Sequence, residues 1–274
     1  MMRTFSPHPM PMEPMITIAL RAARDAARHI VRAYDRPDLI KIREKGPNDF
    51  VTNVDQEAEQ IIAESLKKTF PKHRVTGEES GDLSSVDDSE HQWVIDPIDG
   101  TANFSRQIPH FCVSMACLHR GKLLHGIIVN PITEEEFVAT RGKGAQLNGK
   151  KIRVSSGEKL EGALFASAGR YSESSFHGHA QVVQALVNAG ANYREPGSAA
   201  LELAAVAAGR LDGVWMHGLN LWDIAAGCLL IQEAGGLIGD FKGGLDHLTS
   251  GNLVAANPKI FKSLGTLARQ HLGK

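Results

Sequence analysis

A short apolar run that ends on two closely spaced aspartates is the feature that most restricts the fold of this chain. Residues 93–95 (Trp-Val-Ile) predict a buried strand, and Asp96 stands at its carboxyl end. Pro97 then turns the chain, Asp99 follows, and Gly100 opens a predicted helix. Two carboxylates this close in a partly buried site both ionise only when a cation neutralises them. The segment therefore predicts a strand–turn–helix unit that binds a hard cation such as Mg²⁺, beside helix N–H groups that suit a phosphate.

Three further acidic residues stand at the ends of predicted elements. Glu78 follows a predicted strand within Gly-Glu-Glu-Ser, whereas Asp223 and Asp55 each stand at the start of a helix. Taken singly, each has a simpler explanation, because Glu78 fits a solvated loop and the aspartates fit helix capping. Asp96 and Asp99 could likewise cap a turn. It is the combination of these carboxylates with the strand at residues 93–95 that favours a shared metal site.

The apolar periodicity divides the chain into two halves. Residues 16–157 predict an α+β half with a mainly antiparallel sheet that binds the metal, and residues 158–274 predict an α/β half that completes the site. Residues 1–15 are predicted to be a disordered extension. The predicted helices are 16–34, 52–70, 178–189, 198–208, 221–234 and 258–272, and the predicted strands include 112–118, 123–129, 136–139, 144–147, 163–168, 211–215, 237–238 and 253–256.

Charge and composition argue against several classes of protein. Lys and Arg total 30 and Asp and Glu total 31, so direct nucleic-acid binding is not expected. No apolar stretch approaches the roughly 18 residues of a membrane span, and the first fifteen residues lack the apolar core of a signal peptide. Cys112, Cys117 and Cys228 lie in apolar runs without metal-ligand spacing, which favours buried free thiols. We therefore expect a cytoplasmic protein without membrane contact.

Three longer motifs enclose these acidic residues: GEES (77–80), WVIDPIDGTANF (93–104) and LWDIAAG (221–227). The second and third resemble the two signature motifs of the inositol-monophosphatase family, and the first resembles its glutamate loop. The resemblance is closest to the bacterial branch of SuhB-like members. The similarity runs in order from about residue 16 to the end, through DFVTNVD (49–55), RGKGAQLNG (141–149), PGSAALELAAVAAGRLDG (196–213) and QEAGG (232–236). The resemblance implies the sugar-phosphatase fold, a layered α-β-α-β-α sandwich that combines α+β and α/β halves. It also implies an inositol-1-monophosphatase-like phosphoric monoester hydrolase.

The same resemblance implies a set of metal ligands. Glu78, Asp96 and the backbone carbonyl of Ile98 would hold one Mg²⁺ ion. Asp96, Asp99 and Asp223 would hold a second, and the family pattern implies two or three ions in each active site. Two metal ions can stabilise both the attacking and the leaving oxygen atom of an in-line displacement.

The resemblance also implies residues for catalysis and for substrate binding. Thr101 and Asp55 would position the attacking water and help to deprotonate it, without a covalent phosphoenzyme. The backbone N–H groups of Gly100 and Thr101 would hold the phosphate. The full set of implied substrate-binding residues is Gly100, Thr101, Ser198, Ala199 and Asp223.

The chain departs from the family pattern on the leaving-group side. Met216 stands where an acidic residue usually binds sugar hydroxyls, and a thioether is a poor hydrogen-bond acceptor. The segment at residues 168–171 (Ala-Gly-Arg-Tyr) also differs from that of close relatives. His217 could substitute in the pocket or lie on the surface, and Arg194 could approach the pocket or a dimer interface. Lys45 lies near the position of a family basic residue.

Two classes of function therefore compete. The first is a Mg²⁺-dependent phosphatase for inositol 1-phosphate or a related polyol or sugar phosphate; other members of the family act on fructose 1,6-bisphosphate, histidinol phosphate or 3'-phosphoadenosine 5'-phosphate. The second is a protein partner of the transcription and ribosomal-RNA antitermination machinery, which rests on family analogy alone. The resemblance further implies a homodimer and inhibition by Li⁺.

Overall fold

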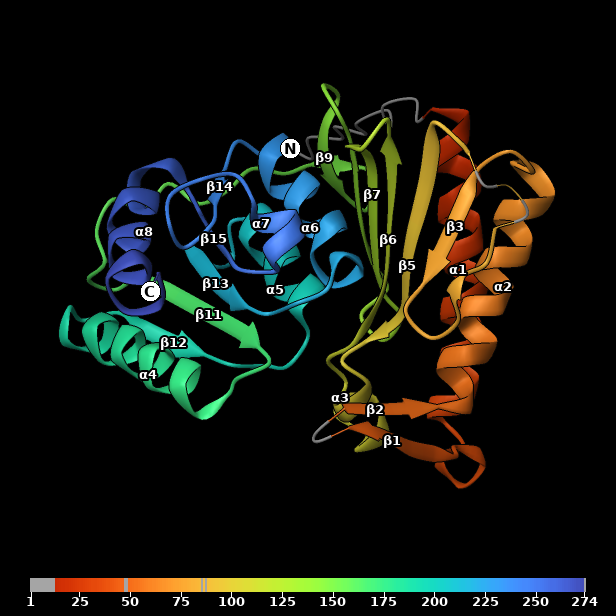
Figure 1. Ribbon diagram of the computed structural model, residues 1–274, viewed down its shortest axis with the longest axis horizontal. Helices are drawn as coiled ribbons and strands as arrows, with labels where there is room; N and C mark the ends of the chain where they lie inside the picture. Colours follow the sequence, from red (N-terminus) through yellow and green to blue (C-terminus); the bar gives the residue numbers. More distant parts are fainter. Residues whose placement is uncertain (1–12, 47–48, 85, 87, 274) are drawn as a thin grey trace, which may run out of the picture.

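The computed structural model describes residues 13–46, 49–84, 86 and 88–273, which form five layers (Figure 1). A pair of helices, an eight-stranded sheet, a second pair of helices, a five-stranded sheet and a third pair of helices follow one another across the molecule. This arrangement confirms the α-β-α-β-α sandwich. Residues 1–12 of the predicted N-terminal extension lie outside the described residues, and the first helix begins at Pro14, two residues before its predicted start.

The larger sheet carries the acidic motifs around Glu78 and Asp96. Its strand order is β10-β9-β8-β7-β6-β5-β3-β4, and neighbours are antiparallel except for β3 and β5, which run parallel. The sheet is therefore mainly antiparallel, as predicted. Its strands are β3 (Arg74–Gly77), β4 (Gly81–Asp82), β5 (His91–Asp99), β6 (Cys112–His119), β7 (Lys122–Asn130), β8 (Glu135–Thr140), β9 (Gly144–Leu147) and β10 (Lys150–Lys151).

Helices α1 (Pro14–Tyr34) and α2 (Asn53–Thr69) cover the outer face of this sheet (Figure 1). α1 buries an apolar stripe that includes Ile16, Leu20 and Ile30, as its three- and four-residue spacing predicts. α2 begins with a capping box in which Thr52 and Asp55 bond each other's backbone N–H groups. A 3₁₀ turn, η1 (Pro37–Leu39), and a hairpin of β1 (Ile42–Gly46) and β2 (Asp49–Thr52) connect the two helices.

The second half of the chain builds the other layers. α5 (Ala199–Ala207) and α6 (Leu221–Glu233) lie between the sheets, and their almost uniformly apolar sequences are buried on nearly all sides. The five-stranded sheet has the order β12-β11-β13-β15-β14. Its strands are β11 (Leu164–Gly169), β12 (Asn192–Arg194), β13 (Gly213–His217), β14 (Leu237–Gly239) and β15 (Leu253–Ala256), with α4 (Glu173–Asn188) and α8 (Pro258–Leu272) outside and the short α7 (His247–Ser250) before β15.

Strand direction decides where the acidic motifs meet. Because β3 and β5 are parallel, their carboxyl ends reach the same edge of the sheet, where Gly77 pairs with Ile95. The pairing of β5 with β6 is irregular between Asp96 and Asp99, and the short helix α3 (Thr101–Ser105) follows at once. Gly100 has φ 99°, a left-handed conformation that favours glycine and lets the chain turn from strand to helix.

Five short strands were not predicted from the sequence, and two of them, β1 and β2, form the hairpin before α2. The hairpin strand β1 is polar and mostly exposed, so it lacks the alternation of apolar and polar residues that marks a half-buried strand. β4, β10 and β12 have only two or three residues each and stand at sheet edges. Their pairing depends on the neighbouring strand more than on their own sequence.

Candidate functional site

Three carboxylates from distant parts of the sequence meet at the edge of the larger sheet. Glu78 follows β3, Asp96 lies in β5, and Asp223 lies in the first turn of α6. One ligand atom from each lies within 4.8 Å of those of the other two. Asp96 is 2% exposed and Asp223 is 7% exposed. This is the spacing and the chemistry of a site for a hard divalent cation.

The electrostatics of these carboxylates fit a cation. Burial, followed by the charge of Glu78, raises the pKa of Asp96 well above its ordinary value. Burial and the charge of Asp99 raise the pKa of Asp223 to about 8. Asp96 Oδ1 is buried and accepts no hydrogen bond from the described residues. An unsatisfied buried carboxylate oxygen is costly, and a metal ion would both neutralise the cluster and provide that oxygen with a partner.

Asp99 lies beside this cluster and is held by the second half of the chain. Its Oδ2 accepts hydrogen bonds from Ser198 Oγ at 2.6 Å and from the backbone N–H of Ala200 at 2.7 Å. Burial raises the pKa of Asp99 to about 6, although the bond from Ser198 opposes the shift. Ser198 is fully buried and does not line the cavity, so it acts on the site through Asp99. Its neighbour Ala199 does line the cavity.

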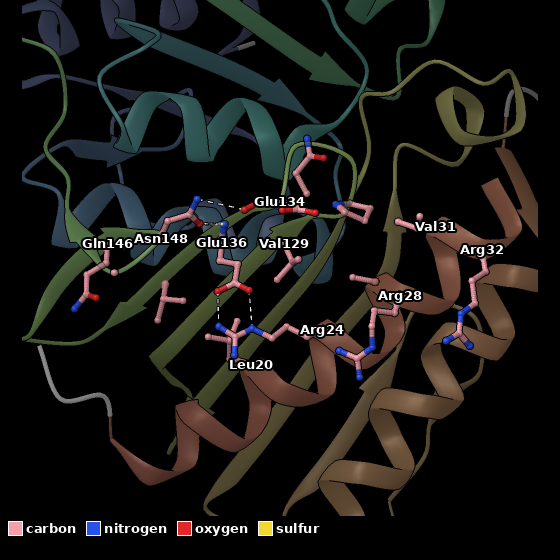
Figure 2. Close-up of a pocket in the computed structure, with 15 residues that line it drawn as sticks. Leu20, Arg24, Arg28, Val31, Arg32, Val129, Glu134, Glu136, Gln146 and Asn148 are labelled. Carbon is pink, nitrogen blue, oxygen red and sulfur yellow. Dashed lines mark hydrogen bonds and ion pairs between the residues drawn. The ribbon is translucent and has the colours of Figure 1, made fainter. Parts of the chain in front are cut away.

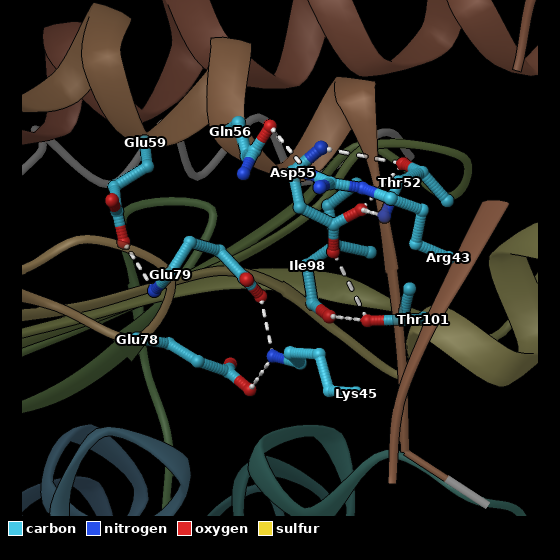
Figure 3. A network of polar contacts seen from close by, with 10 residues as sticks. All are labelled: Arg43, Lys45, Thr52, Asp55, Gln56, Glu59, Glu78, Glu79, Ile98 and Thr101. Atoms are coloured by element: carbon cyan, nitrogen blue, oxygen red, sulfur yellow. Dashed lines mark hydrogen bonds and ion pairs between the residues drawn. The ribbon is translucent and has the colours of Figure 1, made fainter. Parts of the chain in front are cut away.

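Thr101 and Asp55 meet next to the carboxylates (Figure 3). Thr101 Oγ1 lies 3.1 Å from Asp55 Oδ1 and 3.0 Å from the carbonyl oxygen of Ile98. Asp55 Oδ2 accepts a hydrogen bond from the backbone N–H of Thr52 at 2.9 Å, so one carboxylate both caps α2 and contacts Thr101. Burial raises the pKa of Asp55 to about 6. A carboxylate with such a pKa is well suited to accept a proton near neutral pH.

The loop that carries Glu78 rests on a buried glutamate in α2 (Figure 3). Glu59 is 1% exposed, and its Oε2 accepts a hydrogen bond from the backbone N–H of Glu79 at 2.9 Å. Its side chain occupies the space beside Gly77, where an added Cβ would lie 2.0 Å from Glu59 Oε2. Lys45 Nζ lies 3.2 Å from Glu78 Oε1 and 2.9 Å from Glu79 Oε1. The sequence motif did not reveal Glu59, because its role depends on the packing of α2 under the loop.

A cavity of about 250 Å³ opens above these residues. Most of the predicted site residues line it: Glu78, Asp96, Ile98, Asp99, Gly100, Thr101, Ala199 and Asp223. Asp55 and Ser198 lie behind this wall. The lining also includes residues to which the sequence analysis gave no role, namely Phe50, Arg170, Glu195 and Leu219. Phe50 lies in the DFVTNVD motif and Arg170 in the divergent segment 168–171, but neither pattern indicated a cavity residue, and the tertiary structure places all four around one cavity.

The residues whose role the sequence left open are placed as follows. Met216 is fully buried in β13 and does not line the cavity. His217 is also absent from the lining, and its ring stacks on Tyr171 with ring centroids 5.8 Å apart. Arg194 is exposed and donates a hydrogen bond to the carbonyl oxygen of Tyr193 at 2.8 Å, away from the cavity.

A second and larger cavity, of about 820 Å³, lies between α1 and strands β7 to β9 (Figure 2). Arg24, Arg28 and Arg32 form one wall. Arg24 reaches across to Glu136 in a two-bond ion pair with N–O distances of 2.6 Å. None of the clustered carboxylates lines this cavity, so its lining provides none of the metal chemistry described above.

Comparisons with known proteins show the family to which the chain belongs. The model of the "Inositol monophosphatase family" matches residues 11–272. "Nus factor SuhB" of Pseudomonas aeruginosa is 46% identical over 265 residues, covering 95% of this chain and 98% of that protein. The structure of the extragenic suppressor protein suhB from Bartonella henselae is 37% identical, with a TM-score of 0.91, and the match covers 95% of this chain and 100% of that one.

A more distant structure shows ions in this fold. It is described as an IMPase/NADP phosphatase complexed with Mg²⁺ and phosphate, and it is 25% identical with a TM-score of 0.79, covering 93% of this chain and 96% of that one. In the part of this chain that the structure describes, no helix has the length and apolar character needed to cross a membrane. The matched family model and the relatives of high coverage lead to one conclusion: the chain belongs to the inositol monophosphatase family, in the branch that contains the SuhB proteins.

Proposed function

We propose that this chain is a Mg²⁺-dependent phosphomonoesterase that hydrolyses inositol 1-phosphate or a related polyol or sugar phosphate with a metal-activated water. The observation that carries the proposal is the meeting of Glu78, Asp96 and Asp223, whose ligand atoms lie within 4.8 Å of one another. The orphaned Asp96 Oδ1 supports a cation at this point. The family match supports phosphatase chemistry.

In this proposal, Glu78, Asp96 and the carbonyl oxygen of Ile98 hold one Mg²⁺, and Asp96, Asp99 and Asp223 hold a second. The family pattern allows a third ion. Bound Mg²⁺ supplies charge neutralisation and lowers the pKa of water. Lys45 pairs with Glu78 in this structure, so its ammonium group neutralises part of the same charge.

Thr101 and Asp55 would then position the attacking water and help to deprotonate it. Thr101 has one hydroxyl proton and two acceptors within reach, Asp55 Oδ1 and the carbonyl oxygen of Ile98. When it donates to Asp55, its oxygen can accept a hydrogen bond from the water and orient it. The N–H groups of Gly100 and Thr101 would bind the phosphate, and Ala199 and Asp223, which line the cavity, would contact the leaving group.

Phosphate release from a small panel, with Mg²⁺ and with EDTA, tests the proposal. The panel contains inositol 1-phosphate, glycerol 2-phosphate, fructose 1,6-bisphosphate, histidinol phosphate and 3'-phosphoadenosine 5'-phosphate. We expect turnover that requires Mg²⁺ and is greatest with inositol 1-phosphate or another polyol phosphate. A folded protein that releases no phosphate from any of the five would refute the proposal.

A second function is favoured by the names of the relatives. The Pseudomonas aeruginosa protein at 46% identity is a Nus factor. We propose that this chain also binds a protein of the transcription machinery, through contacts that do not require turnover. Asp96→Asn should abolish phosphatase activity but retain binding of that partner. Loss of both properties together, in a variant that remains folded, would contradict a separate binding role.

Three further properties are part of the proposal. We propose that the chain is a cytoplasmic homodimer, and sedimentation at micromolar concentration should show the dimer mass. We also propose inhibition by Li⁺, so turnover should fall in millimolar LiCl and remain in equal NaCl. A monomeric profile would refute the homodimer, and equal rates in the two salts would refute inhibition by Li⁺. Fractionation of cells of the source organism tests the compartment.

A further inference from the structure

The leaving-group side of the cavity carries a carboxylate that no sequence motif indicates. Glu195 lies between β12 and α5 and lines the cavity together with Arg170. Met216 stands at the position where an acidic residue would be expected, but its side chain is fully buried and does not reach the cavity. We infer that Glu195 is the residue that binds the hydroxyl groups of a polyol leaving group, an inference that rests on the proposed phosphatase function.

A chain of directed hydrogen bonds holds Glu195 in place. The indole Nε1–H of Trp215 can only donate, and it lies 3.2 Å from His179 Nδ1. In the neutral ring, Nδ1 is then the acceptor, so Nε2 carries the proton and can donate to the Tyr193 oxygen at 3.3 Å. Tyr193 in turn donates its hydroxyl proton to Glu195 Oε2 at 2.9 Å. Every donor in the chain therefore points toward the Glu195 carboxylate.

The support behind Glu195 is buried and rigid. Trp215 is fully buried and His179 is 3% exposed. The Tyr193 ring stacks on Trp215 with centroids 5.4 Å apart, and its oxygen lies 2.6 Å from Ser167 Oγ. Among the described residues, only Oε2 of Glu195 takes part in this network, which leaves Oε1 for a ligand. A carboxylate held by a packed, hydrogen-bonded network is preorganised for binding.

The charges of this wall indicate the class of leaving group. A carboxylate accepts hydrogen bonds from hydroxyl groups, and the guanidinium group of Arg170 in the same wall can donate to them. Adjacent hydroxyl groups of a polyol ring offer both functions at once. A second phosphate here would be attracted by Arg170 but repelled by Glu195, whereas neutral hydroxyl groups can bond both residues without repulsion. The pair of Glu195 and Arg170 therefore fits a neutral polyhydroxylated leaving group better than a bisphosphate.

Equilibrium binding tests this inference independently of turnover. Titration calorimetry is performed with Ca²⁺ in place of Mg²⁺, because Ca²⁺ also takes oxygen ligands. It measures the Kd of inositol 1-phosphate and the Kd of inorganic phosphate, which has no leaving group. In Glu195→Gln the ratio of the two Kd values, inositol 1-phosphate over phosphate, should rise about tenfold, as expected for the loss of a hydrogen bond to a charged group. Tyr193→Phe should raise the ratio less, because it only releases the carboxylate.

Two comparisons complete the experiment. Glu161→Gln, an exposed glutamate in the same half of the chain and outside the cavity lining, is the matched control and should leave the ratio at the wild-type value. Glu195→Asp keeps the charge and should restore part of the preference. The relative affinity for fructose 1,6-bisphosphate over inositol 1-phosphate should rise in Glu195→Gln, because a repulsive charge has been removed.

An unchanged ratio in Glu195→Gln would overturn the inference. Equal weakening of both ligands would also overturn it, because Glu195 would then act on the phosphate side or on the fold. Failure of wild-type protein to bind inositol 1-phosphate would do the same. Absence of Mg²⁺-dependent turnover, with the expected shift in the Kd ratio, would instead refute the proposed function and leave the role of Glu195 in ligand selection supported.

Discussion

The hydroxyl oxygen of Thr101 lies 3.1 Å from Asp55 Oδ1, and this contact joins the start of α3 to the first turn of α2. Asp55 uses its other oxygen to cap α2, so the geometry of a helix start is also the geometry of the proposed proton acceptor. This arrangement makes the two interpretations of Asp55 compatible, because capping and the proposed catalytic role use different oxygen atoms of one carboxylate.

The first prediction concerns this pair. Thr101→Ala and Asp55→Asn should each lower kcat by about 10²- to 10⁴-fold, the usual contribution of general acid–base catalysis. Thr101→Ser retains the hydroxyl and is the matched control. Initial rates in saturating Mg²⁺ measure the effect, with melting temperatures to show that each variant is folded. A Thr101→Ala enzyme with near wild-type kcat would exclude the proposed role.

The second prediction concerns the support beneath the Glu78 loop. Glu59→Ala leaves the Glu79 backbone N–H without its acceptor, so the free energy of unfolding should fall by about 1–3 kcal/mol. The Mg²⁺ concentration for half-maximal thermal stabilisation should also rise, because Glu78 is no longer held in place. Glu59→Gln keeps an acceptor and should be milder in both measurements.

Two other variants sharpen the test of Glu59. Gly77→Ala should resemble Glu59→Ala, because the added Cβ would lie 2.0 Å from Glu59 Oε2. Glu64→Ala, an exposed glutamate on the same helix, is the control. Wild-type Mg²⁺ titration and urea unfolding in Glu59→Ala would show that the buried glutamate does not position the loop.

The third prediction concerns metal removal. Mg²⁺ should raise the melting temperature, since a ligand at 100 times its Kd stabilises by about 2.7 kcal/mol. Asp96→Asn should lose this rise. In EDTA the same variant should be more stable than wild type, because it removes an ionisable group from a buried cluster of carboxylates whose mutual repulsion no metal ion then relieves. Differential scanning fluorimetry with and without Mg²⁺ measures both effects, and a variant that is less stable than wild type in EDTA would contradict the argument.

The fourth prediction concerns the pH dependence of stability and arises at His73, outside the group of carboxylates proposed to bind metal. Burial, followed by the charge of His91, lowers the pKa of His73 to about 4. Its Nδ1 lies 3.2 Å from Trp93 Nε1, and its ring stacks on His91 with centroids 4.5 Å apart. Because the folded pKa is below the ordinary value of 6.5, the neutral form stabilises the fold. This stability is present above about pH 6.5 and is lost as the pH falls toward 4.

Replacement of His73 tests this pH dependence. His73→Phe cannot titrate, so its stability should fall less steeply between pH 7 and pH 5 than that of wild type. His177→Phe, which replaces an exposed histidine on α4, is the control and should follow wild type. Urea midpoints at pH 7, 6 and 5 give the comparison. Parallel curves for wild type and His73→Phe would assign the pH dependence to other groups.

The local sequence was enough to predict the main helices and strands, and the part of the site that lies between Trp93 and Thr101. Apolar spacing predicted α1 and α2, because a helix repeats every 3.6 residues whatever its neighbours are. The run from Trp93 to Thr101 predicted a strand and a helix start. The turn expected at Pro97 lies at Gly100 instead, because β5 continues through Pro97 to Asp99 and glycine can adopt the left-handed φ of 99°. Those predictions needed no contact between distant residues, and for that reason they could be made from sequence.

The tertiary structure decided which of these residues meet. Parallel pairing of β3 with β5 brings Glu78 beside Asp96, and the packing of α6 between the sheets adds Asp223. In the folded chain Met216 is buried in the core, whereas Glu195 lines the cavity. Side-chain direction on a strand and the approach of two halves are set by non-local pairing, which no single segment of sequence contains.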